Sequence, residues 1–490
     1  MSTLASQPRV PFPASRRGRW EMPSQPDGSP FVRMKPSHRV MVLGFFLVYA
    51  LSAGVLALLT AAPAAELVIP SLFLFIGVRM LPLIVYRSDY GWFHPLVLAA
   101  MLSVVHLAKE FPAYAFGLQY HVALMQYTPD QLGELVSWKL VLMALGLLAY
   151  YVGFRFAPRF PIPSLEFRPA SNLRLKVPAV VLFSTLVFMI YLQGKGGLAA
   201  HVLSWGRGRG VSLAGDFYWF QLTSLATSAC LIWFAVDRRA AWSPLFWMCF
   251  VAALCTQFLG SGSRGGIIYT LVIIVLVWML RERKLAPTRM AMVGVMGMIL
   301  LAVLGNLRNS TWQGSVDWST LTDFSVKHAV GTRATGEIVS RRTVADGALP
   351  ILAYVPGRVP HLYGASYLAA LAAPVPRKFW PGKPGLVGGQ VGRTFFGVRA
   401  GVPATAVGEA YWNFNIPGVL FAFAAFGVFH WWLSRVFLAY GREPLMMLMY
   451  IMVIWNAIEP SSDAVVGGLM SLMPLVVLGV AFGILRLKRY

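Results

Sequence analysis

The feature that most constrains this chain is a series of apolar segments, each long enough to cross a lipid bilayer. A window of about 19 residues detects such a segment when few charges interrupt it. Across the 490 residues this reading predicts about twelve membrane-spanning helices, and two of them are short enough to leave the number uncertain by two. They are expected near residues 40–61, 67–86, 93–108, 135–156, 177–193, 217–236, 242–259, 265–280, 288–305, 406–433, 445–458 and 464–485.

The composition excludes the common classes of soluble protein. Hydrophobic residues make up 57% of the chain and charged residues only 12%, against about 25% charged residues in an ordinary soluble domain. These values exclude a disordered chain and a disulfide-rich secreted module. The three cysteines lie in apolar runs without the spacing of a metal site and are interpreted as small buried side chains. The predicted fold class is therefore an all-α polytopic membrane protein.

Basic residues predict how the helices are oriented. Lys and Arg cluster in the connections at 155–176, 238–239, 281–284 and 435–442, and the C-terminus is also basic. Because such clusters remain on the cytoplasmic side, both termini are predicted to be cytoplasmic. Residues 1–39 are basic and proline-rich without an apolar run, which predicts a disordered tail rather than a cleaved signal. Arg79 lies near the cytoplasmic end of its span and is expected to extend toward the headgroups.

The same orientation places a long loop, residues 306–405, on the outer face. It separates the nine expected spans in 40–305 from the three in 406–490, and its eleven basic and four acidic residues give it a charge of about +7. Guanidinium groups bind phosphate oxygens through paired hydrogen bonds. An arginine-rich face beside a bilayer therefore indicates an anionic lipid headgroup as ligand, and nucleic acid is not expected.

Three motifs are candidates for the chemistry. SGSRGG at 261–266 surrounds Arg264 with glycines where a helix is expected to begin, and a helix N-terminus beside an arginine suits a small anion. PVPRKFWPGKP at 374–384 combines Arg377, Lys378 and Lys383 with Trp380, which suits a glycolipid headgroup or a loop lying on the membrane surface.

The third motif is GEAYWNFNIPGVL at 408–420. Glu409 is the only carboxylate near it, and it is either a proton acceptor or one partner of a structural ion pair. Tyr411 is a candidate to line a sugar site or to lie at the membrane interface. His361, in RVPHLYGASY, is the second candidate for the proton acceptor. The sequence contains no zinc-protease, phosphate-loop or dinucleotide-binding motif, so no metal site and no cofactor are expected.

With these motifs and one large outer loop late in the chain, the sequence resembles bacterial oligosaccharide repeat-unit polymerases of the Wzy type, which are relatives of the O-antigen ligases. The resemblance extends over the membrane part and not over residues 1–39. It implies a glycosyltransferase of the C-type architecture in the bacterial inner membrane, with a periplasmic active face. Undecaprenyl-pyrophosphate-linked oligosaccharides would be both donor and acceptor, undecaprenyl pyrophosphate would leave, and a chain-length co-polymerase would be a possible partner.

The resemblance also suggests roles for individual residues. Arg264 matches the arginine of the family's serine-arginine-glycine turn, which implies that it holds the pyrophosphate. Glu409, and after it His361, are the hypothetical catalytic bases. The expected substrate-binding residues are Arg207, Arg209, Arg308, Arg333, Arg377, Lys378, Trp380, Lys383 and Tyr411.

Three alternatives remain open at this point. An O-antigen ligase would share the chemistry but transfer a finished glycan to a different acceptor, with a loop histidine in the key role. A non-enzymatic lipid or polysaccharide exporter would need charged residues deep in several spans. A scaffold subunit of a polysaccharide machine would use its arginines only to bind anionic membrane lipids.

Overall fold

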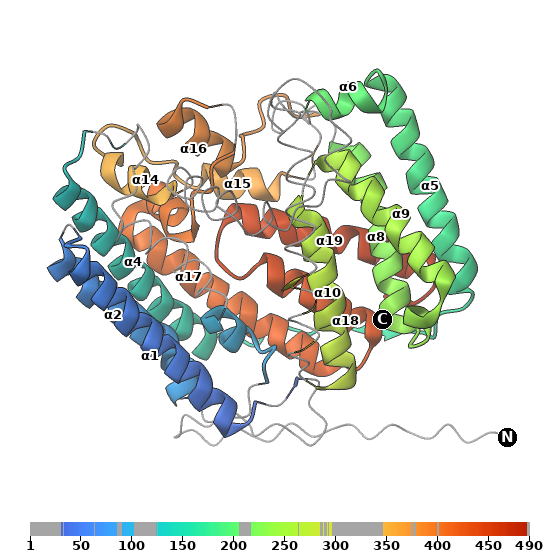
Figure 1. Cartoon of the computed structure of the whole chain (residues 1–490), viewed down its shortest axis with the longest axis horizontal. Coiled ribbons are helices and arrows are strands. Elements are labelled where there is room, and N and C mark those ends of the chain that lie inside the picture. The colour runs from blue at the N-terminus through green and yellow to red at the C-terminus, as the bar shows by residue number, and fades with distance from the viewer. Residues whose placement is uncertain are drawn as a thin grey trace.

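The computed structural model describes residues 31–32, 34–62, 64–85, 91–101, 124, 126–204, 217–262, 264–284, 288, 292, 294–295, 346–373, 375, 379–398 and 401–487. Among these residues, nine helices are long and apolar enough to cross a membrane, judged by length and composition. This arrangement is that of a mostly helical, multi-pass membrane protein (Figure 1). The nine helices are α1 (Pro36–Leu59), α2 (Ala65–Val85), α4 (Pro129–Arg155), α5 (Leu173–Gly194), α8 (Phe217–Val236), α9 (Pro244–Ser261), α10 (Arg264–Glu282), α17 (Ala406–Tyr440) and α19 (Ser462–Ala481).

Each of these nine helices overlaps one of the expected spans. The expected span at 445–458 corresponds to α18 (Pro444–Asn456), which has 13 residues and is shorter than the other nine. The expected span at 93–108 is described only as far as residue 101, and the one at 288–305 lies almost wholly outside the described residues. A total of twelve spans therefore stays a prediction.

Short elements complete the described chain. In the expected outer loop, three short helices follow one another: α14 (Ala348–Tyr354), α15 (Ala365–Leu371) and α16 (Val387–Phe396). They lie together at one end of the helix bundle, near the start of α17 (Figure 1). The remaining elements are α6 (Gly197–Ser204), η3 (Ala240–Trp242), β1 (Leu165–Phe167) and β2 (Leu485–Leu487).

Close packing of α4 against α17 forms the centre of the bundle. Gly153 of α4 lies so near the Ala424 carbonyl that an added Cβ would overlap it, and Gly427 of α17 is equally close to the Tyr150 carbonyl. Lipid supplies little hydrophobic force for helix association, so membrane helices associate largely through close packing. Small residues allow this packing because they let the backbones approach each other. The outer helices show the complementary pattern, since α1 buries Ala50 and Ala57 while its other side exposes large apolar residues.

Helix α17 is interrupted near its start. Phe414 (φ −145°, ψ 28°) and Asn415 (φ 56°, ψ −147°) depart from helical geometry, and Pro417 follows. Gly418 permits the turn, because a side chain there would overlap the carbonyl oxygen of Ala410. The span expected at 406–433 is therefore not one continuous helix. A short segment, Ala406–Asn413, carries the GEAYWN residues and precedes the longer membrane-length part of α17.

Several connections gather at the opposite end of the bundle. Strands β1 and β2 pair in antiparallel orientation, with Leu165 opposite Leu487. The Tyr440 hydroxyl, at the end of α17, donates to the Pro163 carbonyl at 2.8 Å. The Phe31 ring packs on Phe437, also near the end of α17, with 5.1 Å between ring centroids. The first described residues and the C-terminal strand thus share one end, whose cytoplasmic assignment stays a prediction.

Candidate functional site

A small cavity lies inside the bundle, between α2, α4, the start of α17 and the connection from α18 to α19. Most of its wall is apolar, and Met143 and Phe423 are typical members. Three charged side chains interrupt that wall: Arg79, Lys139 and Glu459. The cavity volume is about 30 Å³, which holds roughly two water-sized groups. The site therefore accepts a small polar group between opposite charges.

Arg79 and Lys139 are both deeply buried in this wall. The Arg79 side chain is 4% exposed, and Nη2 donates to the Ala99 carbonyl at 2.6 Å. The guanidinium lies 5.5 Å from the centre of the Phe75 ring, and Nε has no hydrogen-bond partner among the described residues. The expectation that Arg79 extends to the headgroups is wrong, because its side chain points into the bundle. A buried charge in a membrane helix is costly and usually functional.

Lys139 of α4 forms an ion pair with Asp346, just ahead of α14. The distance from Nζ to Oδ2 is 2.6 Å, and the side chains are 4% and 16% exposed. The other oxygen of Asp346 accepts a hydrogen bond from the Ala348 amide at 2.9 Å and so holds the start of α14. The ion pair thereby holds the start of α14 against α4.

Glu459 lies opposite, in the short connection before α19. It is half-buried and lines the cavity, and its carboxylate attracts the Arg79 guanidinium electrostatically. The two side chains form no ion pair within 4 Å, and the Glu459 side chain has no hydrogen bond to the described residues. Sequence reasoning missed Glu459, Lys139 and Asp346. A lysine inside the expected span at 135–156 was a usable signal, whereas nothing local distinguishes the two acids.

Glu409 lies beside this cavity in a separate buried polar cluster. Its side chain is fully buried, and Oε2 accepts a hydrogen bond from the Ser462 amide at 2.8 Å. Oε1 has no hydrogen bond of normal geometry within the described part of the chain. Burial and the nearby Glu409 charge raise the pKa of the Tyr367 phenol well above its ordinary value. Glu409 forms no ion pair with any described basic residue. The structural ion pair considered as the alternative role of Glu409 is therefore not seen among the described residues.

Asn413, one turn further along α17, connects the cluster to α15. Its Oδ1 accepts from the Gly364 amide at 2.8 Å, and its Nδ2 donates to the Ser366 hydroxyl at 2.8 Å. The GEAYWN residues therefore join the starts of α15, α17 and α19. A general base must reach the substrate hydroxyl, and the full burial of Glu409 favours a positioning role over direct contact.

His361 lies on the neighbouring stretch of the outer segment. Its Nδ1 lies 3.1 Å from the Trp412 carbonyl, while the Trp412 indole nitrogen donates to the Pro360 carbonyl at 3.1 Å. No contact between His361 and Glu409 is described, although Trp412 is only three residues beyond Glu409. The two predicted bases therefore belong to one region without forming one site.

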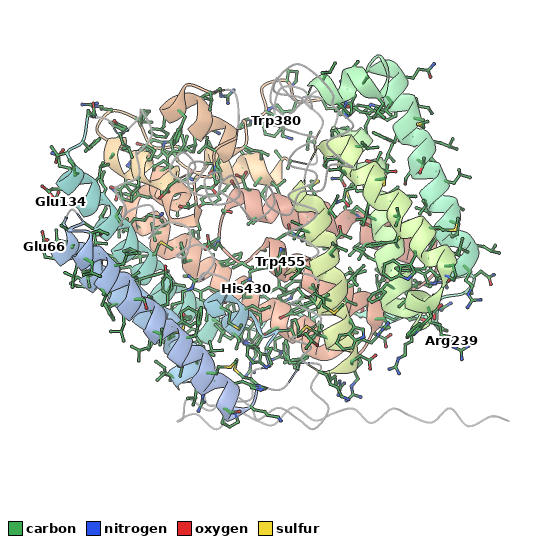
Figure 2. All side chains as sticks on the ribbon, in the orientation of Figure 1. Glu66, Glu134, Arg239, Trp380, His430 and Trp455 are labelled. Atoms are coloured by element: carbon green, nitrogen blue, oxygen red, sulfur yellow. The ribbon has the colours of Figure 1, made fainter. Side chains whose placement is uncertain are left out.

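Three further predicted residues have described side chains, and none of the three lines the cavity: Lys383, Tyr411 and Trp380. Lys383 donates to the carbonyls of Ala373 and Val375, at 2.9 and 3.0 Å, and so holds its own loop. Tyr411 is buried in the apolar core around α17, and Trp380 is 37% exposed at the end of the molecule near α15 and α16 (Figure 2).

The position of Arg264 is described only through its backbone. It begins α10, directly after the turn in which Gly262 has φ 59°. One turn further on, the Tyr269 hydroxyl accepts from Asn456 of α18 at 2.8 Å. This contact places the start of α10 beside the end of α18, near the connection that holds Glu459. The following residues lie outside the described part of the chain: Arg207, Arg209, Arg308, Arg333, Arg377 and Lys378.

Comparison of the chain with known proteins does not assign it to a family. The chain matches no protein-family model, no curated protein and no solved structure. Among the described residues, no group of three or more His, Cys, Asp or Glu side chains is arranged to hold a metal ion. The assignment of a function therefore depends on the residues and their geometry.

Proposed function

We propose that the protein is a membrane glycosyltransferase that joins undecaprenyl-pyrophosphate-linked oligosaccharide repeat units at the periplasmic face. The observation that best supports the proposal is the cavity holding Arg79, Lys139 and Glu459, which lies inside a bundle of membrane-length helices. The ion pair between Lys139 and Asp346 holds the start of α14 beside it. This combination suits a reaction between a lipid-linked donor and a polar acceptor.

The chemistry has two requirements that side chains alone can meet. The departing pyrophosphate needs positive charge, which arginines and the start of a helix supply without a metal ion. In the proposal, Arg264 at the start of α10 holds this group, and the basic residues of the outer segment assist. The attacking sugar hydroxyl needs a proton acceptor, for which a carboxylate is suitable.

The first experiment uses purified protein in lipid vesicles with the host's own undecaprenyl-pyrophosphate-linked repeat units. Wild type is expected to give a ladder of products separated by size, with release of undecaprenyl pyrophosphate. Arg264→Ala is expected to lower the rate of ladder formation by about 10²–10³-fold, as for the loss of one charge-stabilising donor. The matched control is Arg168→Ala, an exposed arginine paired with Glu166 at the opposite end of the bundle, which should leave the ladder unchanged.

Other outcomes would contradict the polymerase in specific ways. Transfer of a single glycan after addition of a second acceptor, with no ladder, would identify a ligase. Movement of the intact lipid-linked glycan across the vesicle membrane, with no new glycosidic bond, would identify an exporter. One observation favours this last candidate, because Arg79 and Lys139 are charged residues buried in two different spans. An equal ladder from wild type and Arg264→Ala would reject the role of Arg264 in the proposal.

A further inference from the structure

Several carboxylates of the described residues lie near the start of α17, among them Asp346, Glu409, Glu459 and Asp463. Asp346 has both oxygens occupied, one by Lys139 and one by the Ala348 amide. Glu409 is fully buried, and Asp463 lies against Gly388 of α16, where a Cβ would come 3.1 Å from its Oδ2. Neither Glu409 nor Asp463 lines the cavity. Glu459 does line it, and the Glu459 side chain has no hydrogen bond to the described residues.

Glu459 and Arg79 have complementary hydrogen-bonding needs across the cavity. Arg79 lines the cavity, and its guanidinium carries only N–H donors. Glu459 presents carboxylate oxygens, which act as acceptors. A hydroxyl group can accept from the first and donate to the second at the same time. The cavity has room for a group of that size, while the rest of a sugar ring would remain outside it.

The chain holds Glu459 in a well-defined place. Asn456, at the end of α18, donates to the Met452 carbonyl and to the hydroxyls of Tyr269 and Ser471. Pro460 follows Glu459 directly, and the Ser461 amide donates to the Glu459 carbonyl at 2.8 Å. A reactive group supported by such contacts keeps its geometry with little loss of conformational freedom.

We propose that Glu459 is the general base of the glycosyl transfer and that Arg79 orients the acceptor hydroxyl toward it. This inference rests on the proposed function. The acceptor hydroxyl gives its proton to the Glu459 carboxylate while its oxygen forms the new bond to the anomeric carbon. The bond from that carbon to the pyrophosphate oxygen breaks, and its electron pair leaves with undecaprenyl pyrophosphate. Glu459 then releases the proton to water.

The test measures polymerisation by Glu459→Gln in the same vesicle assay. The expected result is a fall in kcat of about 10²–10⁴-fold, as for loss of a general base, with the KM for the acceptor changed little. Glu459→Asp keeps the carboxylate and is expected to retain part of the activity together with the acidic limb of the pH–rate profile, which Glu459→Gln loses. Glu166→Gln is the matched control, since this exposed carboxylate pairs with Arg168 at the opposite end of the bundle, and it should keep the wild-type activity.

Each result separates the two proposals. If wild type makes no polymer, the proposed function fails and the role of Glu459 fails with it. If wild type polymerises and Glu459→Gln keeps more than a tenth of its kcat, only the role of Glu459 is overturned. If the melting curve shows that Glu459→Gln no longer folds, the kcat of Glu459→Asp becomes the test. Unchanged kcat in that variant would overturn the inference, because a carboxylate withdrawn by one methylene no longer reaches the same hydroxyl.

Discussion

Replacing Lys139 with methionine is expected to destabilise the protein by about 3 kcal/mol, because it leaves the Asp346 charge unpaired in a mostly buried place. The melting temperature in detergent micelles should fall accordingly. The second change, Asp346→Asn, removes the unpaired charge and keeps an oxygen that accepts from the Ala348 amide. The double variant Lys139→Met/Asp346→Asn should therefore recover a large part of the lost stability.

The comparison of single and double variants isolates the pair. If the double variant melts no higher than Lys139→Met alone, the loss would come from packing around Lys139 and not from the unpaired acid. If Lys139→Met melts like wild type, the ion pair would not hold the start of α14 to α4. Arg168→Ala, which breaks an exposed pair with Glu166, is the matched control and should change stability by less than about 1 kcal/mol.

The second large effect is expected from a single methyl group between α4 and α17. A Cβ at position 153 would overlap the Ala424 carbonyl, which belongs to the backbone and cannot turn away. Gly153→Ala must push the two helices apart, and we expect it to cost at least about 3 kcal/mol, at the upper end of the range for overpacked cores. Gly427→Ala should act in the same way, since it meets the Tyr150 carbonyl from the other helix.

The matched control for these variants is Gly44→Ala in α1. Gly44 lies in a helix interior like Gly153, but a Cβ there would meet nothing within 4 Å. Alanine favours helix over glycine by about 0.8–1.0 kcal/mol, so this variant should melt at or slightly above the wild-type temperature. Similar melting temperatures for Gly44→Ala and Gly153→Ala would show that α4 and α17 are not in close backbone contact.

The membrane helices could be predicted from sequence because the bilayer imposes a simple rule. Every polar backbone group in the lipid must be bonded within its own segment, so a span appears as a long apolar run. The break in α17 was less evident, although Asn415, Pro417 and Gly418 are residues typical of turns and occur together in that run. Hydropathy registers how apolar they are and not which backbone angles they favour.

The candidate site was harder to predict because its members are far apart in the chain. Lys139 and Asp346 are 207 residues apart, and Arg79 and Glu459 face the same cavity only after α2, α4, α17 and the connection before α19 have packed together. The GEAYWN motif was a useful indication of a polar cluster, but its partner Ser462 is 53 residues beyond Glu409. No local sequence pattern predicts such distant pairs. The motifs could therefore be found from the sequence, whereas the cavity could be found only from the packed structure.

The interruption of α17 has a mechanical consequence. A continuous helix would carry any change in its tilt from the lipid directly to Glu409. Here the backbone changes direction at Phe414 and Asn415, and the segment before the break is held by α15 and α19. The longer part of α17 packs on α4 through Gly427, so the two parts of the helix are anchored to different neighbours. The break therefore separates the segment that positions the polar cluster from the segment that packs along the bundle.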